Sequence, residues 1–195
     1  MKVLQLLESK GESRIVAVFP GRFQPFHRGH AAIFEYLYNV YEHAFIATSN
    51  VTNDNSPFTF DEKLILATAA GVDSERVVMT HHPYKPIEIL ENYNSTQDKL
   101  VIALSAKDRE RFEFTRDSYF QLFQEGSQMI SFDTHAYILI VPTIKFRIVG
   151  KILKSATAIR NFYSIAGEEQ RKNIIEDLYG HYNLEVRKLF DEKLS

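Results

Sequence analysis

Short apolar runs alternate with amphipathic segments along most of this chain. Five runs have the length and the β-branched or aromatic content of strands: 15–20, 44–48, 76–80, 100–105 and 136–141. The runs VIALS and YILIV are almost continuously apolar, as expected for strands that are covered on both faces. Helical spacing separates them at 28–42, 60–70, 87–93 and near 107–112.

This alternation predicts an α/β fold, a Rossmann-like parallel sheet with helices on both faces and ligands at its carboxyl edge. After residue 155 the pattern is helical at 156–165, 168–178 and 184–193, and Gly167 and Gly180 are expected to stop helices. No repeat or linker interrupts the chain. We expect a single domain over 1–195, with a core of about 15–162 and a helical C-terminal cap at about 163–195 that also offers a possible homo-oligomer contact.

Composition narrows the class of protein. The chain has 195 residues, 45% of them hydrophobic, which is enough for a sizeable core. The absence of cysteine excludes disulfides, thiolate zinc sites and cysteine nucleophiles. A net charge of −2 argues against a nucleic-acid partner, and no apolar run has the length of a membrane span. The first residues lack the layout of a signal peptide, so we expect a cytoplasmic protein.

The segment GRFQPFHRGH, residues 21–30, follows the first apolar run directly. Gly21 and Pro25 mark a turn, after which a helix is expected to begin. Free backbone N–H groups and the helix dipole favour an anion at such a place, and Arg22 and Arg28 add positive charge. The segment therefore predicts a site for an anion, in our interpretation a nucleotide.

His27 and His30 are spaced to lie on one face of that helix, one turn apart. Gly29 between them lets a base or a phosphate chain approach the backbone. Imidazoles donate hydrogen bonds to phosphoryl oxygens and, when protonated, offset charge on a transferring phosphorus. The alternative is that one histidine caps the helix and the other is an ordinary surface residue.

A second informative segment is KILKSATAIR, residues 151–160. Ser155 and Thr157 are candidate N-caps for a helix whose first turn would hold phosphate oxygens, and Arg160 projects from the same turn. Basic residues gather here, at 145, 147, 151, 154 and 160. An ordinary helix cap with an exposed arginine is the alternative.

Together these motifs resemble the HxGH nucleotidyltransferase superfamily, and GRFQPFHRGH is most similar to the archaeal-type nicotinamide-nucleotide adenylyltransferases. SPFTFDEK, residues 56–63, resembles the NPFT-x-x-E-R segment of that family, and KSATAIR resembles its ISGT-x-x-R. The resemblance covers about 15–162. It departs from the family at Ser56, Lys63 and Lys154 and in the absence of tryptophan, and the departures at Lys63 and tryptophan concern recognition of the acceptor.

The resemblance implies transfer of an adenylyl group from ATP to nicotinamide mononucleotide, giving NAD and pyrophosphate, with Mg²⁺ held mainly through the ATP phosphates. It implies catalytic roles for His27, His30 and Arg160. The candidate ATP contacts are Gly21, Arg22, Phe23, Gln24, Gly29, Asp108, Ser155 and Thr157, and the candidate acceptor contacts are Thr59 and Lys63.

Other candidates are weaker. Asp108 could bind a ribose hydroxyl and Lys107 a phosphate, although a solvated helix start explains them equally well. His81 and His82 are adjacent, so their side chains point apart, and we expect no protein-held metal. The alternatives for function are a sibling enzyme with another phosphorylated acceptor (a phosphopantetheine adenylyltransferase or a cytidylyltransferase) and a non-catalytic nucleotide-binding module.

Overall fold

The computed structural model describes residues 13–106, 108–112, 114–115, 117–142, 147–153 and 155–194. Within them, six parallel strands form one sheet in the order β3-β2-β1-β4-β6-β5. The strands are β1 (Ile15–Pro20), β2 (His43–Thr48), β3 (Val77–Met79), β4 (Lys99–Ser105), β5 (Phe120–Leu122) and β6 (Ala136–Val141). The strand order reverses between β1 and β4, which is where open α/β sheets bind ligands.

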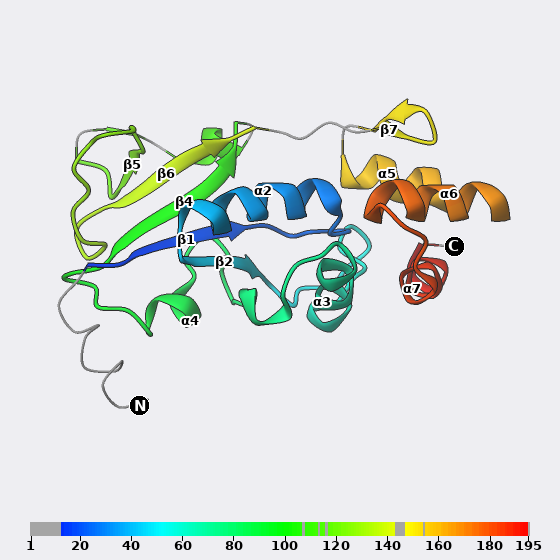
Figure 1. Cartoon of the computed structure of the whole chain (residues 1–195), viewed down its shortest axis with the longest axis horizontal. Helices are drawn as coiled ribbons and strands as arrows, with labels where there is room; N and C mark the ends of the chain where they lie inside the picture. Colours follow the sequence, from blue (N-terminus) through cyan, green and yellow to red (C-terminus); the bar gives the residue numbers. More distant parts are fainter. Residues whose placement is uncertain are drawn as a thin grey trace.

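Helices connect the strands and extend the chain beyond them. They are α2 (Arg28–Val40), α3 (Phe60–Ala69), α4 (Ile87–Leu90), α5 (Ala156–Ser164), α6 (Glu168–Tyr179) and α7 (Leu184–Leu194), with 3₁₀ turns at Ser74–Arg76 and Asp108–Arg111. A two-stranded hairpin, β7 (Arg147–Ile148) and β8 (Lys151–Ile152), precedes α5. In Figure 1, α2 runs along the sheet, and α5, α6 and α7 gather beyond the carboxyl ends of the strands.

The expected Rossmann-like α/β fold is confirmed, with four corrections to its details. The edge strand β5 and the hairpin were not predicted, because runs of two or three residues carry no readable period. The turn at Asp108–Arg111 is a 3₁₀ helix, and Lys107, expected at its start, lies outside the described residues. The helix expected at 87–93 is only the single turn α4. Gly167 caps the start of α6 instead of stopping α5, whereas Gly180 ends α6 with a φ of 82°.

The C-terminal helices share a hydrophobic core with the sheet. Alternate residues of β1 point to opposite faces, so Ala17 and Phe19 pack in one cluster while Val16 and Val18 pack in another. The first cluster continues into Tyr163 of α5, into α6 and into α7. Because burial of such side chains is the main driving force of folding, these helices are held firmly at the carboxyl edge of the sheet.

Candidate active site

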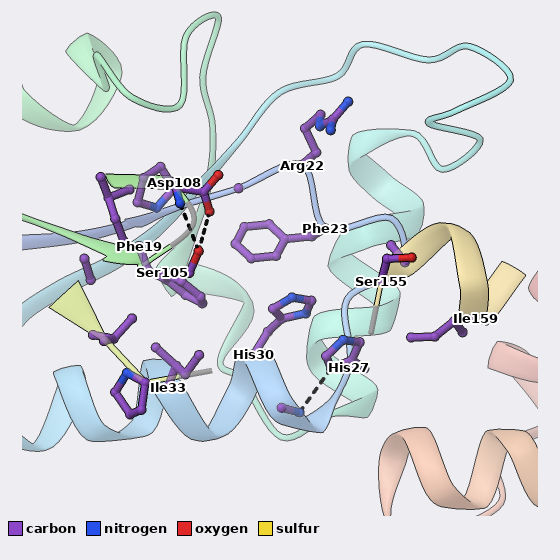
Figure 2. A pocket seen from close by; sticks show the side chains of 18 of the residues that line it. Phe19, Arg22, Phe23, His27, His30, Ile33, Ser105, Asp108, Ser155 and Ile159 are labelled. Atoms are coloured by element: carbon purple, nitrogen blue, oxygen red, sulfur yellow. Dashed lines mark hydrogen bonds between the residues drawn. The ribbon is translucent and has the colours of Figure 1, made fainter. Parts of the chain in front are cut away.

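Two pockets open at the carboxyl edge, and Figure 2 shows the larger one. The large pocket has a volume of about 790 Å³ and extends from the loop after β1 to the ends of β4 and β6 and to α5. The small pocket has a volume of about 260 Å³ and lies between that loop, the β2–α3 loop and α5. Most candidate residues line one or both of them: Gly21, Arg22, Phe23, Gln24, His27, Gly29, His30, Asp108, Ser155, Thr157 and Arg160.

The loop of residues 21–27, here called the motif loop, is held by hydrogen bonds from distant parts of the chain. The Gln24 amide pairs with the Phe58 backbone in both directions, with Nε2 donating to the carbonyl and Oε1 accepting from the N–H, each at 2.9 Å. Arg160 Nη1 donates to the Gln24 carbonyl at 2.7 Å. The buried Tyr179 hydroxyl donates to the Phe26 carbonyl at 2.7 Å. The backbone of the loop is thereby fixed before any ligand binds.

The two imidazoles stack, with ring centroids 3.8 Å apart and an interplanar angle of 21°. His27 is the N-cap of α2, because its Nδ1 accepts a hydrogen bond from the Gly29 N–H at 3.2 Å. The capping alternative is therefore true of His27, and the residue lines the large pocket as well. Burial and the charge of Arg28 lower the pKa of His27 to about 4. With Nδ1 acting as the acceptor, the neutral ring carries its proton on Nε2.

His30 is packed among aromatic rings and lines both pockets. Its ring centroid lies 5.0 Å from that of Phe23 and 5.3 Å from that of Phe26. Burial and the neighbouring His27 hold its pKa well below the usual value, so both imidazoles are neutral at pH 7. Its buried Nδ1 has no hydrogen-bond partner among the described atoms. A buried polar atom without a partner costs free energy, and in native proteins such atoms call for a functional explanation.

Positive charge without a matching carboxylate gathers around the small pocket. Arg22 is exposed and makes no hydrogen bond or ion pair with the described residues. Arg160 is only 8% exposed, and burial together with the charge of Arg22 lowers its pKa while leaving it a cation at neutral pH. Its second guanidinium nitrogen, Nη2, is 3.4 Å from Thr157 Oγ1. Two guanidinium groups that repel each other and have no carboxylate partner among the described residues are able to bind an anion together.

The start of α5 and the segment after β4 contribute short polar side chains to the large pocket. Ser155 is the N-cap of α5, since its hydroxyl accepts from the Ala158 N–H at 3.1 Å. Beyond β4, the Ser105 hydroxyl donates to the Asp108 carboxylate at 2.7 Å, as Figure 2 shows. This bond orients the carboxylate that the sequence suggested for a ribose hydroxyl.

The two acceptor candidates form bonds within the protein instead of lining either pocket. Thr59 and Glu62 form a capping box at the start of α3. Lys63 is 1% exposed, and its Nζ donates to the Ser49 carbonyl at 2.5 Å and approaches Thr48 Oγ1 at 3.3 Å. Burial without a carboxylate lowers its pKa to about 8. The geometry therefore makes both residues part of the frame of the β2–α3 loop.

Several lining residues were not singled out from the sequence. Tyr84, from the loop after β3, and Asn55, from the β2–α3 loop, each reach a pocket from an irregular segment without a motif. Ile148 and Ile152 come from the hairpin, where Val149 and Gly150 both have positive φ. Positive φ at both central residues is typical of a tight hairpin turn, so the Val-Gly pair was the available signal, although valine is rare there.

The donor set fits a magnesium ion that is held mainly by a ligand's phosphates. Among the described residues, Asp108 is the only carboxylate that lines either pocket, and no group of three or more His, Cys, Asp or Glu side chains could hold a metal. Mg²⁺ commonly binds through one or two carboxylates, waters and substrate phosphates. His81 is exposed and bonds to Glu88 at 2.7 Å. None of the helices in the described residues has the length and apolar content that a membrane span requires.

Comparisons with known proteins agree with this architecture. Solved structures with the same fold include a nicotinic acid mononucleotide adenylyltransferase of Plasmodium falciparum, with a TM-score of 0.55 at 11% identity over 93% of this chain and 100% of that one. A bifunctional NMN adenylyltransferase/ADP ribose pyrophosphatase of Francisella tularensis gives a TM-score of 0.54 at 18% identity over 92% of this chain and 49% of that one. At these identities the likeness concerns the fold alone.

The relatives in sequence are named as adenylyltransferases for two different acceptors. The chain is 38% identical over 69 residues to the nicotinamide-nucleotide adenylyltransferase of Sulfurisphaera tokodaii, a match to 32% of this chain and 40% of that protein. It is 21% identical over 150 residues to the phosphopantetheine adenylyltransferase of Francisella philomiragia, a match to 77% of this chain and 86% of that protein. The cytidylyltransferase-like family model matches residues 18–189. The chain therefore belongs to the cytidylyltransferase-like family of the nucleotidyltransferase superfamily, as its opening motif indicated.

Proposed function

We propose that this protein transfers an adenylyl group from ATP to nicotinamide mononucleotide, releasing pyrophosphate and forming NAD. The observation that carries the proposal is the set of uncompensated donors at one place. His30 has a buried nitrogen without a partner among the described atoms, and Arg22 and Arg160 line the adjoining small pocket. Donors fixed in position before the reaction stabilise the charge that develops on a transferring phosphorus.

The chemistry needs alignment more than it needs a general base. An oxygen of the acceptor phosphate attacks the α-phosphorus of ATP, and the bond from that phosphorus to the bridging oxygen breaks, so that pyrophosphate leaves with the electron pair. Because the acceptor phosphate is already ionised, no proton has to be removed from it. The chain's part is to hold two anions together and to offset their charge. Bound Mg²⁺ would supply further charge neutralisation on the phosphates, with Asp108 available near it.

The named residues divide this work. The neutral His27 and His30 act as hydrogen-bond donors to phosphoryl oxygens, because their lowered pKa values leave them uncharged at pH 7. Arg22 and Arg160 supply the permanent positive charge. In the large pocket, apolar residues from β4, β6 and the hairpin enclose a volume of about 790 Å³ that suits a nucleoside.

A second candidate is phosphopantetheine as the acceptor. It is favoured by the length of the match to the Francisella philomiragia protein, which covers 77% of this chain, although its identity is only 21%. The match to the Sulfurisphaera tokodaii protein has the higher identity, 38%, but is confined to 69 residues. Both candidates use ATP in the same way and differ only in the acceptor.

A pyrophosphate-release assay separates these possibilities. Purified protein with Mg²⁺ is given ATP or CTP together with nicotinamide mononucleotide, nicotinate mononucleotide or phosphopantetheine, and the product is identified by mass. We expect release with ATP and nicotinamide mononucleotide. Release only with phosphopantetheine would establish the second candidate, release only with CTP would identify a cytidylyltransferase, and binding of ATP without release under any pairing would favour a non-catalytic module.

A further inference from the structure

The side chain of Phe23 stands between the two pockets. Phe23 lines both of them, and so do Arg22, His30 and Ala156. Figure 2 shows its ring reaching from the motif loop into the large pocket above His30. The ring centroids of Phe23 and His30 lie 5.0 Å apart in an edge-to-face arrangement. The ring therefore occupies the boundary that a ligand reaching from one pocket into the other has to cross.

The ring also covers the backbone of Gly21. A Cβ atom placed on Gly21 would lie 2.6 Å from Phe23 Cζ and within 3 Å of both neighbouring ring carbons. Gly21 follows β1 directly and is the first residue of the motif loop, where an open backbone would let a phosphate chain come close. Here the surface exposed by the missing side chain is covered by an aromatic ring of the same loop.

The backbone of Phe23 is in an unusual conformation. Its φ is 47°, in the left-handed region that bulky residues rarely adopt. Phe23 is nevertheless only 6% exposed. Its ring packs edge-on against Phe19, with ring centroids 5.3 Å apart, and at a tilt against Phe26, with centroids 5.1 Å apart. Aromatic packing thus compensates an unfavourable backbone, and such compensated conformations are typical of ligand clamps and switches.

We propose that Phe23 is a gate between the large and the small pocket, closed in this structure and opened by the phosphate chain of the bound nucleotide. The inference rests on the proposed function only in taking a nucleoside triphosphate as the ligand. With its nucleoside in the large pocket and its outer phosphates near Arg22 and Arg160, such a ligand has to pass the place where the ring now lies. Opening turns the ring about its side-chain bonds while the backbone keeps its ties at Gln24 and Phe26, and so uncovers Gly21 and frees the edge of His30 for the phosphate.

A single tryptophan can report the movement, since the chain contains none. In Phe23→Trp, saturating ATP or inorganic tripolyphosphate should shift the emission to the red and increase quenching by acrylamide several-fold. Tripolyphosphate has no base, so its effect cannot come from adenine stacking on the indole. Phe45→Trp is the matched control, because Phe45 packs against Tyr93 and lines neither pocket. Its emission should stay constant.

Calorimetry on the wild type separates failure of the gate from failure of the proposed function. If ATP binds but the emission of Phe23→Trp does not change, or if Phe45→Trp responds equally, the gate is wrong and the proposed function stands. If neither ATP nor tripolyphosphate binds, both are wrong.

Phe23→Asn provides an independent test that does not need the indole to fit. Asparagine tolerates left-handed φ and removes the ring, so tripolyphosphate should associate several-fold faster than with the wild type. An equal or slower rate would overturn the gate.

Discussion

The motif loop and the start of α3 both carry family-like residues, yet the fold uses them in opposite ways. In the motif loop and the first turn of α2 that follows it, the backbone is tied down by Gln24, Arg160 and Tyr179. The His30 nitrogen and the Arg22 guanidinium there have no partner among the described residues. At the start of α3, the polar atoms of Thr59 and Lys63 form hydrogen bonds within the protein itself. The contrast shows that the residues available to a ligand are those whose backbone is fixed by other parts of the chain and whose polar side-chain atoms have no hydrogen-bond partner within the described protein.

The largest effect is expected from His30→Ala. Loss of a prepositioned donor lowers kcat/KM for ATP by about 100- to 1000-fold in comparable sites, and we expect a loss of that size. Circular dichroism should show the wild-type fold, since only one partly buried ring is removed. His43→Ala is the control, because His43 bonds to Tyr93 and lines neither pocket. Unchanged turnover in folded His30→Ala would remove the imidazole from the mechanism.

Arg160→Ala should come next. Removal of a charge donor costs about 2–4 kcal/mol of transition-state stabilisation, obtained from the ratio of kcat/KM values for ATP. Arg160→Lys should recover only part of this, because an ammonium cannot form two parallel bonds to phosphate oxygens. If both variants are kinetically silent, the start of α5 is only a helix cap.

Tyr179→Phe probes the ties of the backbone instead of the ligand groups. It removes the hydroxyl that donates to the Phe26 carbonyl, so unfolding free energy should fall by about 1–3 kcal/mol, the range for a buried group left unpaired. Turnover should fall less than in Arg160→Ala. Tyr182→Phe, at an exposed position of the same region, is the control and should leave denaturant unfolding unchanged. Equal stability of the two variants would show that the tie contributes nothing.

Lys63→Met should have the smallest effect on activity, because the ammonium lies behind the β2–α3 loop. Its signature is a pH dependence. Burial lowers the Lys63 pKa from 10.5 to about 8, so between these values the unfolded chain binds more protons than the folded one. The stability contributed by this group is therefore complete above pH 10.5 and is lost as the pH falls toward 8. The unfolding free energy of the wild type minus that of Lys63→Met should therefore rise as the pH increases from about 8 to 10.5. A difference that does not change with pH would contradict the burial of a titrating amine.

The parts of the fold that could be predicted are those with strong local patterns. β1 and β6 were found to the residue, because continuous apolar runs leave little choice of boundary. The histidines, Arg160 and Asp108 were selected because their residue types and their position after strands point to phosphate and ribose chemistry; the structure places all four at the two pockets, and their roles stay predictions. The hydrogen bond from Tyr179 to Phe26 joins residues 153 positions apart and leaves no local signal. The burial of Lys63 could not be predicted, because lysine is almost never fully buried and its residue type suggests an exposed or ligand-facing cation.

The account's central claim is tested most directly by measuring kcat/KM for ATP and unfolding free energy on His30→Ala and Lys63→Met side by side. His30→Ala should lose turnover by orders of magnitude with little loss of stability, whereas Lys63→Met should keep turnover near that of the wild type and change mainly the pH dependence of unfolding. The reverse pattern, with turnover lost in Lys63→Met and kept in His30→Ala, would contradict the division between a ligand-facing region, made of the motif loop and the first turn of α2, and a structural start of α3.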